Sequence, residues 1–188
     1  MGQAFLVWDG DHYRVLPSEG GHSDFAPSGA VQDGLFRALG EQLGRVSWER
    51  LLSGPGIANI YQYLRASGAA PEQPSVRAEL DTEDDGKVIV THALDRSDPL
   101  SIRALELFWE VLGAQAGNLA LTVLATGGVY LAGGIAPRLV QRLDAGPFLT
   151  AFRNKGRLSP LLARVPLHVI MNPGVGILGA AAVAGRMA

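Results

Sequence analysis

The chain has 188 residues, of which 47% are hydrophobic and 18% charged, with a formal net charge of -2 and a pI near 6.1. This composition is typical of a globular domain, and the lack of a basic surplus gives no reason to expect a nucleic-acid partner. Because the chain contains no cysteine, disulfides, thiolate metal sites and cysteine nucleophiles are excluded, which is consistent with a reducing cytoplasm. The first ten residues also lack the pattern of a signal peptide.

The first predicted element is a strand, a turn and a second strand over residues 3–15, with W-D-G-D of residues 8–11 as the turn. The sequence E-G-G-H follows at residues 19–22, and its two adjacent glycines predict a flexible loop. Glu19, His22 and Asp24 could converge there on one small polar ligand. A hydrogen-bonded loop with a structural histidine explains the same residues, and residue types alone favour this plainer interpretation.

Apolar residues at helical spacing predict a helix that ends at Gly44, and they are Val31, Leu35, Phe36, Leu39 and Leu43. Ser47 can then cap a short helix that carries Glu49, and G-P-G of residues 54–56 precedes a helix over residues 57–66. Glu49 is a second binding candidate. Most acids in a first helical turn are merely stabilising, however, which is its plainer explanation.

Residues 67–98 form the polar and acidic part of the chain, which includes the run D-T-E-D-D of residues 81–85. This composition predicts a mainly solvated excursion. Within it, residues 87–94 are ambiguous, because V-I-V favours a strand while the flanking residues allow a helix.

Asp98 and Pro99 predict the capped start of a long and mostly buried helix. The uncharged residues 114–137 are long enough to be weighed as a membrane span, since roughly 20 apolar residues suffice to cross a bilayer. Polar residues and glycine pairs interrupt the run, so a buried core is favoured.

Residues 129–132 are predicted to form a buried strand that runs into Gly133 and Gly134. Glycines at the carboxyl end of a strand let a ligand approach the backbone closely in an α/β sheet. A plain strand-to-helix turn explains them about equally well.

The remaining pattern predicts a helix that opens at Pro137, short helices between residues 148 and 162, a strand over 165–170 and a final helix over 175–187. Strands alternating with helices indicate an α/β architecture. No metal site is expected, because His12, His22, His92 and His168 show no ligand spacing. The basic run of Arg153, Lys155 and Arg157 is interpreted as a solvated face.

Four segments, taken in order, resemble the bacterial glucokinase family. They are P-S-E-G-G-H-S-D-F-A-P at residues 17–27, S-W-E-R-L-L-S-G-P-G at 47–56, V-Y-L-A-G-G-I-A-P-R-L at 129–139, and M-N-P-G-V-G-I-L-G-A-A-A at 171–182. The resemblance is to the ATP-dependent, non-zinc type, because the cysteine-rich zinc motif of the related sugar kinases cannot exist without cysteine.

The resemblance implies an α/β fold, the large lobe of the actin- and hexokinase-like (ribonuclease H-like) ATPases, with a sheet flanked by many helices. Residues 1–164 would form this lobe, and residues 165–188 would lie at the boundary with a small lobe. Glu19, His22 and Glu49 would hydrogen-bond the hydroxyls of glucose, the two loop glycines bringing the first two against the sugar. Gly2, Gly133 and Gly134 would contact ATP, which would carry Mg²⁺, and no zinc is expected.

In the family, a first phosphate loop and the aspartate general base lie about a hundred residues before this point, and neither is found in this sequence. The resemblance therefore implies the C-terminal lobe of a cytoplasmic, homodimeric glucokinase that acts in glycolysis. No nucleic acid or membrane is expected as a partner, and the chain is expected to be inactive without its N-terminal small lobe. A non-catalytic sugar-sensing or interaction module derived from a glucokinase is the alternative.

Overall fold

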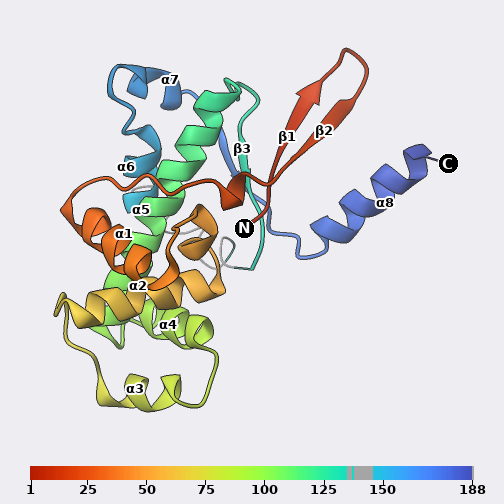
Figure 1. Ribbon diagram of the computed structural model, residues 1–188. Coiled ribbons are helices and arrows are strands. Elements are labelled where there is room, and N and C mark those ends of the chain that lie inside the picture. Colours follow the sequence, from red (N-terminus) through yellow and green to blue (C-terminus); the bar gives the residue numbers. More distant parts are fainter. Residues whose placement is uncertain (135–136, 138–145, 188) are drawn as a thin grey trace. The chain divides into compact units, whose positions relative to one another are not determined.

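The computed structural model describes residues 1–134, 137 and 146–187, and all of the helix predicted to open at Pro137, except Pro137 itself, lies outside these residues. The chain divides into two compact units, Met1–Val111 and Leu112–Ala188. Figure 1 shows their helices and strands. Helix α5 (Pro99–Thr122) contributes residues to both units. This division does not bear on the lobe boundary expected at residues 164–165, which stays a prediction.

The first unit begins with an antiparallel hairpin of β1 (Gln3–Trp8) and β2 (Tyr13–Ser18), in which Gln3 pairs with Ser18 and Trp8 with Tyr13. The predicted strand, turn and strand are confirmed. Asp9 stabilises the turn, because its Oδ1 accepts hydrogen bonds from the backbone N–H groups of Asp11 and His12 at 3.1 and 3.0 Å. The N–H of His12, followed by that of Asp11, lowers the pKa of the Asp9 carboxyl.

Helices α1 (Ala30–Leu43) and α2 (Gly54–Ala66) pack together through buried residues, among them Leu35, Ile57 and Ile60. Gly44 ends α1 as predicted, with a φ of 74° that favours glycine. Helix α2 begins three residues earlier than predicted, because Ser53 Oγ accepts a hydrogen bond from the Gly56 N–H at 3.0 Å and so caps the helix at Gly54.

The prediction of a solvated excursion over residues 67–98 is wrong. The segment contains α3 (Pro74–Leu80) and α4 (Asp85–Leu94), and α4 packs against both α2 and α3. The ambiguous V-I-V triplet is helical and buried, and Asp84 caps α4 by accepting a hydrogen bond from the Lys87 N–H at 2.8 Å. The cap starts a helix whose apolar face is covered by the neighbouring helices, so burial outweighs the strand preference of valine and isoleucine.

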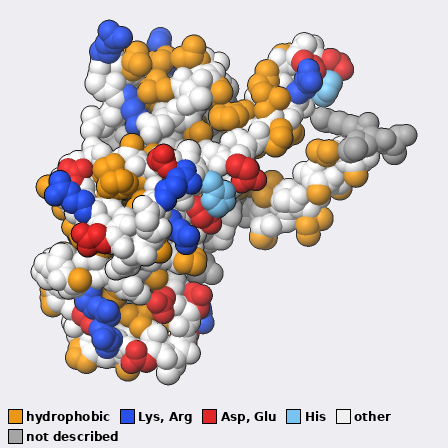
Figure 2. All heavy atoms as spheres, viewed as in Figure 1, with side chains coloured by type: hydrophobic (Ala, Val, Ile, Leu, Met, Phe, Trp, Pro, Cys, Tyr) orange, Lys and Arg blue, Asp and Glu red, His pale blue; other side chains and the backbone are white. Residues whose placement is uncertain are grey.

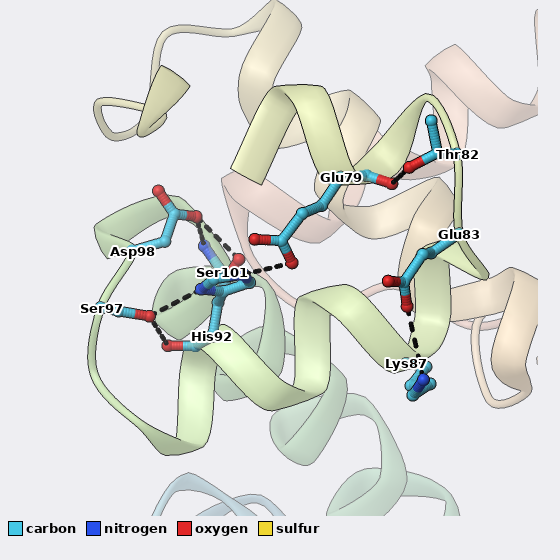
Figure 3. Close-up of polar contacts among 8 residues, drawn as sticks. All are labelled: Glu79, Thr82, Glu83, Lys87, His92, Ser97, Asp98 and Ser101. Atoms are coloured by element: carbon cyan, nitrogen blue, oxygen red, sulfur yellow. Dashed lines mark hydrogen bonds and ion pairs between the residues drawn. The ribbon is translucent and has the colours of Figure 1, made fainter. Parts of the chain in front are cut away.

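Polar contacts join α3, α4 and the start of α5 (Figure 3). His92 Nε2 lies 2.9 Å from Glu79 Oε2, and His92 Nδ1 lies 2.7 Å from Ser97 Oγ. Asp98 is fully buried and accepts three hydrogen bonds, from the Gln73 N–H and from both the N–H and the hydroxyl of Ser101. The predicted cap at Asp98 therefore also joins α5 to the residue before α3.

The second unit contains a parallel pair of strands, β3 (Val129–Leu131) and β4 (Leu167–Val169), with Tyr130 opposite His168. The prediction that β3 is a buried strand is wrong. Tyr130 is exposed, and its ring stacks on that of His168 with 4.7 Å between centroids. An uncharged sequence indicates burial only where another element covers both faces of the strand, and no described element buries Tyr130.

Helix α6 (Pro147–Arg153) lies against α5 at two glycines. The approach is so close that a Cβ atom at Gly113 would overlap the backbone of Phe148 and one at Gly117 would overlap Phe152. Lys155, just beyond α6, donates hydrogen bonds to Ala114 O at 3.0 Å and Asn118 Oδ1 at 2.7 Å. Its partial burial lowers the pKa of the ammonium group. Lys155 thus departs from the solvated face predicted for the basic run, whereas Arg153 and Arg157 are exposed.

The unit continues through a short 3₁₀ turn (Gly156–Leu158) and α7 (Ser159–Leu162), and its last helix is α8 (Val175–Met187). Large apolar side chains are exposed on α8 and on the β1–β2 hairpin of the first unit (Figure 2). Among the helices that the structure describes, none has the length and apolar character needed to cross a membrane.

Candidate functional site

The E-G-G-H segment forms a single 3₁₀ turn, η1 (Gly20–His22). The His22 N–H donates to Glu19 O at 2.9 Å, and the Ser23 hydroxyl donates to Gly20 O at 2.6 Å. On the other side of the turn, the Gly20 N–H donates to Ser18 Oγ at 2.8 Å. The turn is therefore held by its own hydrogen bonds, and the predicted flexible loop is a defined structure.

Both glycines of this turn lie close to other parts of the chain. A Cβ atom at Gly20 would overlap Gln3 Oε1 and lie 2.9 Å from Ser18 Oγ, and one at Gly21 would overlap the carbonyl oxygen of Met1. Neither glycine has a positive φ. A side chain at Gly21 would therefore clash with the backbone of Met1, whereas at Gly20 the nearest atoms are the ends of the Gln3 and Ser18 side chains.

A second 3₁₀ turn, η2 (Trp48–Arg50), carries Glu49 and lies beside η1. Two extended segments, residues 23–25 and 46–48, join the turns: the Phe25 N–H donates to Val46 O at 3.0 Å and the Trp48 N–H donates to Ser23 O at 3.1 Å. The buried rings of Phe25 and Trp48 meet edge to face with centroids 5.1 Å apart. Pairing and aromatic packing together fix η1 and η2 next to each other.

The structure brings Glu19 and His22 together, with Glu19 Oε2 3.9 Å from His22 Nε2, and leaves both open to solvent at 93% and 62% exposure. Glu49 is partly buried and forms an ion pair with the Met1 amino group. Since the Met1 carbonyl oxygen lies against Gly21, Met1 links Glu49 to η1. Two carboxylates and an imidazole on adjoining turns can accept hydrogen bonds from hydroxyls, and the imidazole can also donate one. In Figure 2, acidic, basic and histidine side chains gather over η1.

Asp24 does not join this group. Its Oδ1 accepts a hydrogen bond from Arg45 Nε at 2.7 Å, and Arg45 Nη2 donates to the His22 carbonyl oxygen, also at 2.7 Å. The sequence analysis missed Arg45. No local pattern could have found it, because 21 residues separate it from Asp24 and 23 from His22.

Gly2, Gly133 and Gly134 share an open environment as far as the described residues go, since none of those residues places an atom within 4 Å of the position that a Cβ would take at any of them. Gly133 also has a φ of 110°, which favours glycine. Gly2 belongs to the first unit and the other two glycines to the second, directly after β3. Their surroundings thus leave the backbone accessible to a ligand. Within the described residues, no group of acidic and histidine side chains could hold a metal ion.

A small polar cavity of about 190 Å³ lies elsewhere, between α2, α3 and α4, and is lined by residues that include Tyr61, Arg65 and Arg77. The Tyr61 hydroxyl donates to Glu72 Oε1 at 2.9 Å, and burial followed by this hydrogen bond raises the pKa of the phenol. The cavity is smaller than typical ligand sites, which measure about 300–1,000 Å³. Tyr61, Arg65 and Arg77 each pair with Glu72, so we assign the cavity no ligand.

The whole chain is similar to known glucokinases. A family model described as Glucokinase matches residues 1–187. The glucokinase of Nostoc punctiforme is 44% identical over 200 residues, which cover 100% of this chain and 59% of that protein. The glucokinase of Synechocystis sp. is 40% identical over 202 residues, covering 99% of this chain and 56% of that protein. The chain therefore spans a little under three fifths of the length of these relatives.

Two solved structures are similar in fold. A glucokinase from an Antarctic psychrotroph superposes with a TM-score of 0.82 at 31% identity, over 98% of this chain and 55% of that one. A glucokinase from Balamuthia mandrillaris, solved in complex with glucose, gives a TM-score of 0.77 at 23% identity, over 92% of this chain and 47% of that one. These likenesses confirm the expected α/β fold class.

Proposed function

This chain belongs to the glucokinase family, and we propose that it carries the glucose-binding surface of an ATP-dependent glucokinase. The complete enzyme would transfer the γ-phosphoryl group of ATP to the 6-hydroxyl of glucose in the cytoplasm. The observation that carries the proposal is the placement of Glu19 and His22 on η1 beside Glu49 on η2.

These side chains suit a densely hydroxylated ligand. Carboxylates accept hydrogen bonds from sugar hydroxyls, and a hydrogen bond to a charged group contributes about 1.5–3 kcal/mol. A site built from such groups penalises sugars that lack a hydroxyl, because a polar partner is then left unpaired. The fixed conformation of η1 and η2 supports this selectivity, since little order remains to be imposed when the sugar binds.

Gly133 and Gly134 would contact the nucleotide, and Gly2 would lie by its phosphates. The open backbone at all three glycines supports this role. Mg²⁺ would arrive with ATP and neutralise charge on the phosphates. Phosphoryl transfer relies mainly on positioning and electrostatic stabilisation. Because the relatives are longer than this chain, we propose that the general base and a first phosphate loop lie outside these 188 residues. We therefore expect no glucose 6-phosphate from the chain alone.

Calorimetric titration of the chain with glucose tests the sugar site. We expect Glu19→Gln to weaken binding about ten- to a hundredfold, which corresponds to the loss of one charged hydrogen-bonding partner. Glu41→Gln is the matched control, because Glu41 is an exposed acid on α1. If Glu19→Gln and Glu41→Gln bound glucose as tightly as the unaltered chain, the E-G-G-H turn would be structural and the site assignment wrong.

Family membership also leads us to propose a homodimer in the complete enzyme. Exposed apolar side chains on α8, with Ile177 at 79% exposure, support a further contact there, either with a second copy or with the rest of a longer chain. Light scattering over a range of concentrations measures the association. A monodisperse monomer at the highest concentration would count against it.

A further inference from the structure

Arg45 bridges His22 of η1 and Asp24, two residues further along, with a single guanidinium group. Its Nε donates to the Asp24 carboxylate and its Nη2 to the His22 carbonyl oxygen, both at 2.7 Å. Charge-assisted hydrogen bonds of this length are among the stronger ones in proteins, and the planar fork of arginine fixes direction as well as distance. The contact therefore constrains the backbone of the residue that carries the imidazole.

The position of Arg45 makes this constraint specific to η1. Arg45 directly precedes the extended segment 46–48, which pairs with residues 23–25. The backbone pairing holds the chain from Ser23 onward, while the internal hydrogen bonds of η1 hold Glu19 and Gly20. The His22 carbonyl lies between these two sets of contacts, and the guanidinium of Arg45 is the side chain that reaches it.

We propose that Arg45 is a positioning residue that fixes His22, and thereby the imidazole that faces the sugar. The functional half of this inference rests on the proposed glucose site. Arg45 itself is not a ligand in this scheme. It acts through the orientation of His22, and Asp24 holds the guanidinium in place.

The exposure of the Arg45–Asp24 pair distinguishes a positioning role from a role in stability. The Arg45 and Asp24 side chains are 63% and 75% exposed, and exposed ion pairs of this kind contribute little to the free energy of unfolding. Removing the guanidinium should therefore leave the thermal midpoint nearly unchanged while it alters the local geometry at His22. A residue that served only stability would show the opposite pattern.

The first test needs no ligand. In two-dimensional NMR spectra of the chain, we expect Arg45→Met to shift or broaden the imidazole signals of His22 and the amide signals of Gly20–His22. Arg45→Lys should do the same, because an ammonium group keeps the charge but cannot form the two-armed bridge. Arg77→Met is the matched control, since Arg77 is 51% exposed and pairs with Glu72, away from η1. Unchanged His22 signals in both Arg45 variants would overturn the proposal.

The second test measures glucose binding in a double-mutant cycle. We expect Arg45→Met to weaken glucose about two- to tenfold, the effect of losing one hydrogen bond that orients a ligand group. The same change should add nothing in a His22→Ala chain, because the residue through which Arg45 acts is gone. An equal additional loss in that background would mean that Arg45 acts independently of His22, and would overturn the proposal.

Failure of the proposed function and failure of the Arg45 proposal give different results. If the unaltered chain binds no glucose, or if Glu19→Gln has no effect on binding, the proposed function fails. The NMR comparison then still decides whether Arg45 positions His22.

Discussion

A methyl group added at Gly113 should destabilise the protein, although the same change normally stabilises a helix. Alanine is favoured over glycine in a helix interior by about 1 kcal/mol. At Gly113, however, the new Cβ would lie 2.8 Å from the carbonyl carbon of Phe148 and 2.9 Å from its Cα, and closer still to its carbonyl oxygen. These neighbours are backbone atoms of α6, which cannot rotate away as a side chain could.

The expected size follows from these distances. Ordinary contacts of a Cβ begin near 3.4 Å, so α6 would have to move away by at least 0.6 Å, the difference between 3.4 and 2.8 Å. Overpacking of this kind costs roughly 1–3 kcal/mol, and it also separates the buried rings of Phe148 and Phe152 from their present neighbours. Against a propensity gain of about 1 kcal/mol, we expect a net loss of up to roughly 2 kcal/mol. That corresponds to a fall of about 4–8 °C in Tm for a chain of this size.

Urea and thermal unfolding followed by circular dichroism measure this loss. Gly40→Ala in α1 is the matched control, because a Cβ there would meet no atom within 4 Å and should stabilise the helix by about 1 kcal/mol. The two substitutions are chemically identical, so opposite signs isolate the contact with α6. If Gly113→Ala raised the Tm as much as Gly40→Ala, the close crossing of α5 and α6 would be refuted.

Other predictions concern buried polar groups. Asp98→Ala should lower the free energy of unfolding by roughly 3 kcal/mol or more, since three buried hydrogen bonds lose their acceptor, and a loss below about 1 kcal/mol in urea would contradict this. Ser53→Ala should cost about 1 kcal/mol by removing the cap of α2, and it should also weaken glucose binding, because the Ser53 hydroxyl donates to Glu49 O at 2.8 Å. Burial lowers the pKa of Lys155, so between that pKa and the ordinary value of 10.5 the unfolded chain binds more protons and stability rises with pH. The stability of the unaltered chain relative to Lys155→Met should therefore increase as the pH approaches 10.5, and a flat difference would argue against the shift.

Elements with strong local signals were predictable from the sequence. The turn residues gave the β1–β2 hairpin, and Gly44 gave the end of α1. Helices α3 and α4 were not predictable in this way, because their buried side chains, such as Val76 and Ile89, are few and lie among acidic residues. In such a helix the exposed polar residues outnumber the buried apolar ones, so the composition of the segment suggests a solvated structure. Only the packing of α4 against α2 and of α3 against α4 shows which faces are covered.

Part of the candidate site was also predictable from the sequence, and part depended on tertiary structure. Glu19 and His22 are three residues apart, so their proximity could be expected from the sequence. The placement of Glu49 depends on pairing between residues 23–25 and 46–48, which is tertiary structure, and only the family resemblance anticipated it. The sequence predicted that Gly20 and Gly21 matter through flexibility, and the structure adds close contacts at both positions. Glycine pairs indicate either flexibility or close approach, and the neighbours that decide between the two, Met1 and Gln3, are brought there by the hairpin.

Residues 1–3 connect the proposed sugar site to the proposed phosphate site. The Met1 carbonyl oxygen lies against Gly21 and the Gln3 side chain lies against Gly20, so the η1 turn of the proposed sugar site rests on the same short stretch of chain. Gly2 lies between these two contact residues and has open space at its Cβ position. If Gly2 contacts the phosphates as proposed, residues 1–3 join the sugar site to the phosphate site directly. The two sites would then be only one or two residues apart along the backbone, and this short connection would help to hold sugar and nucleotide in register for transfer.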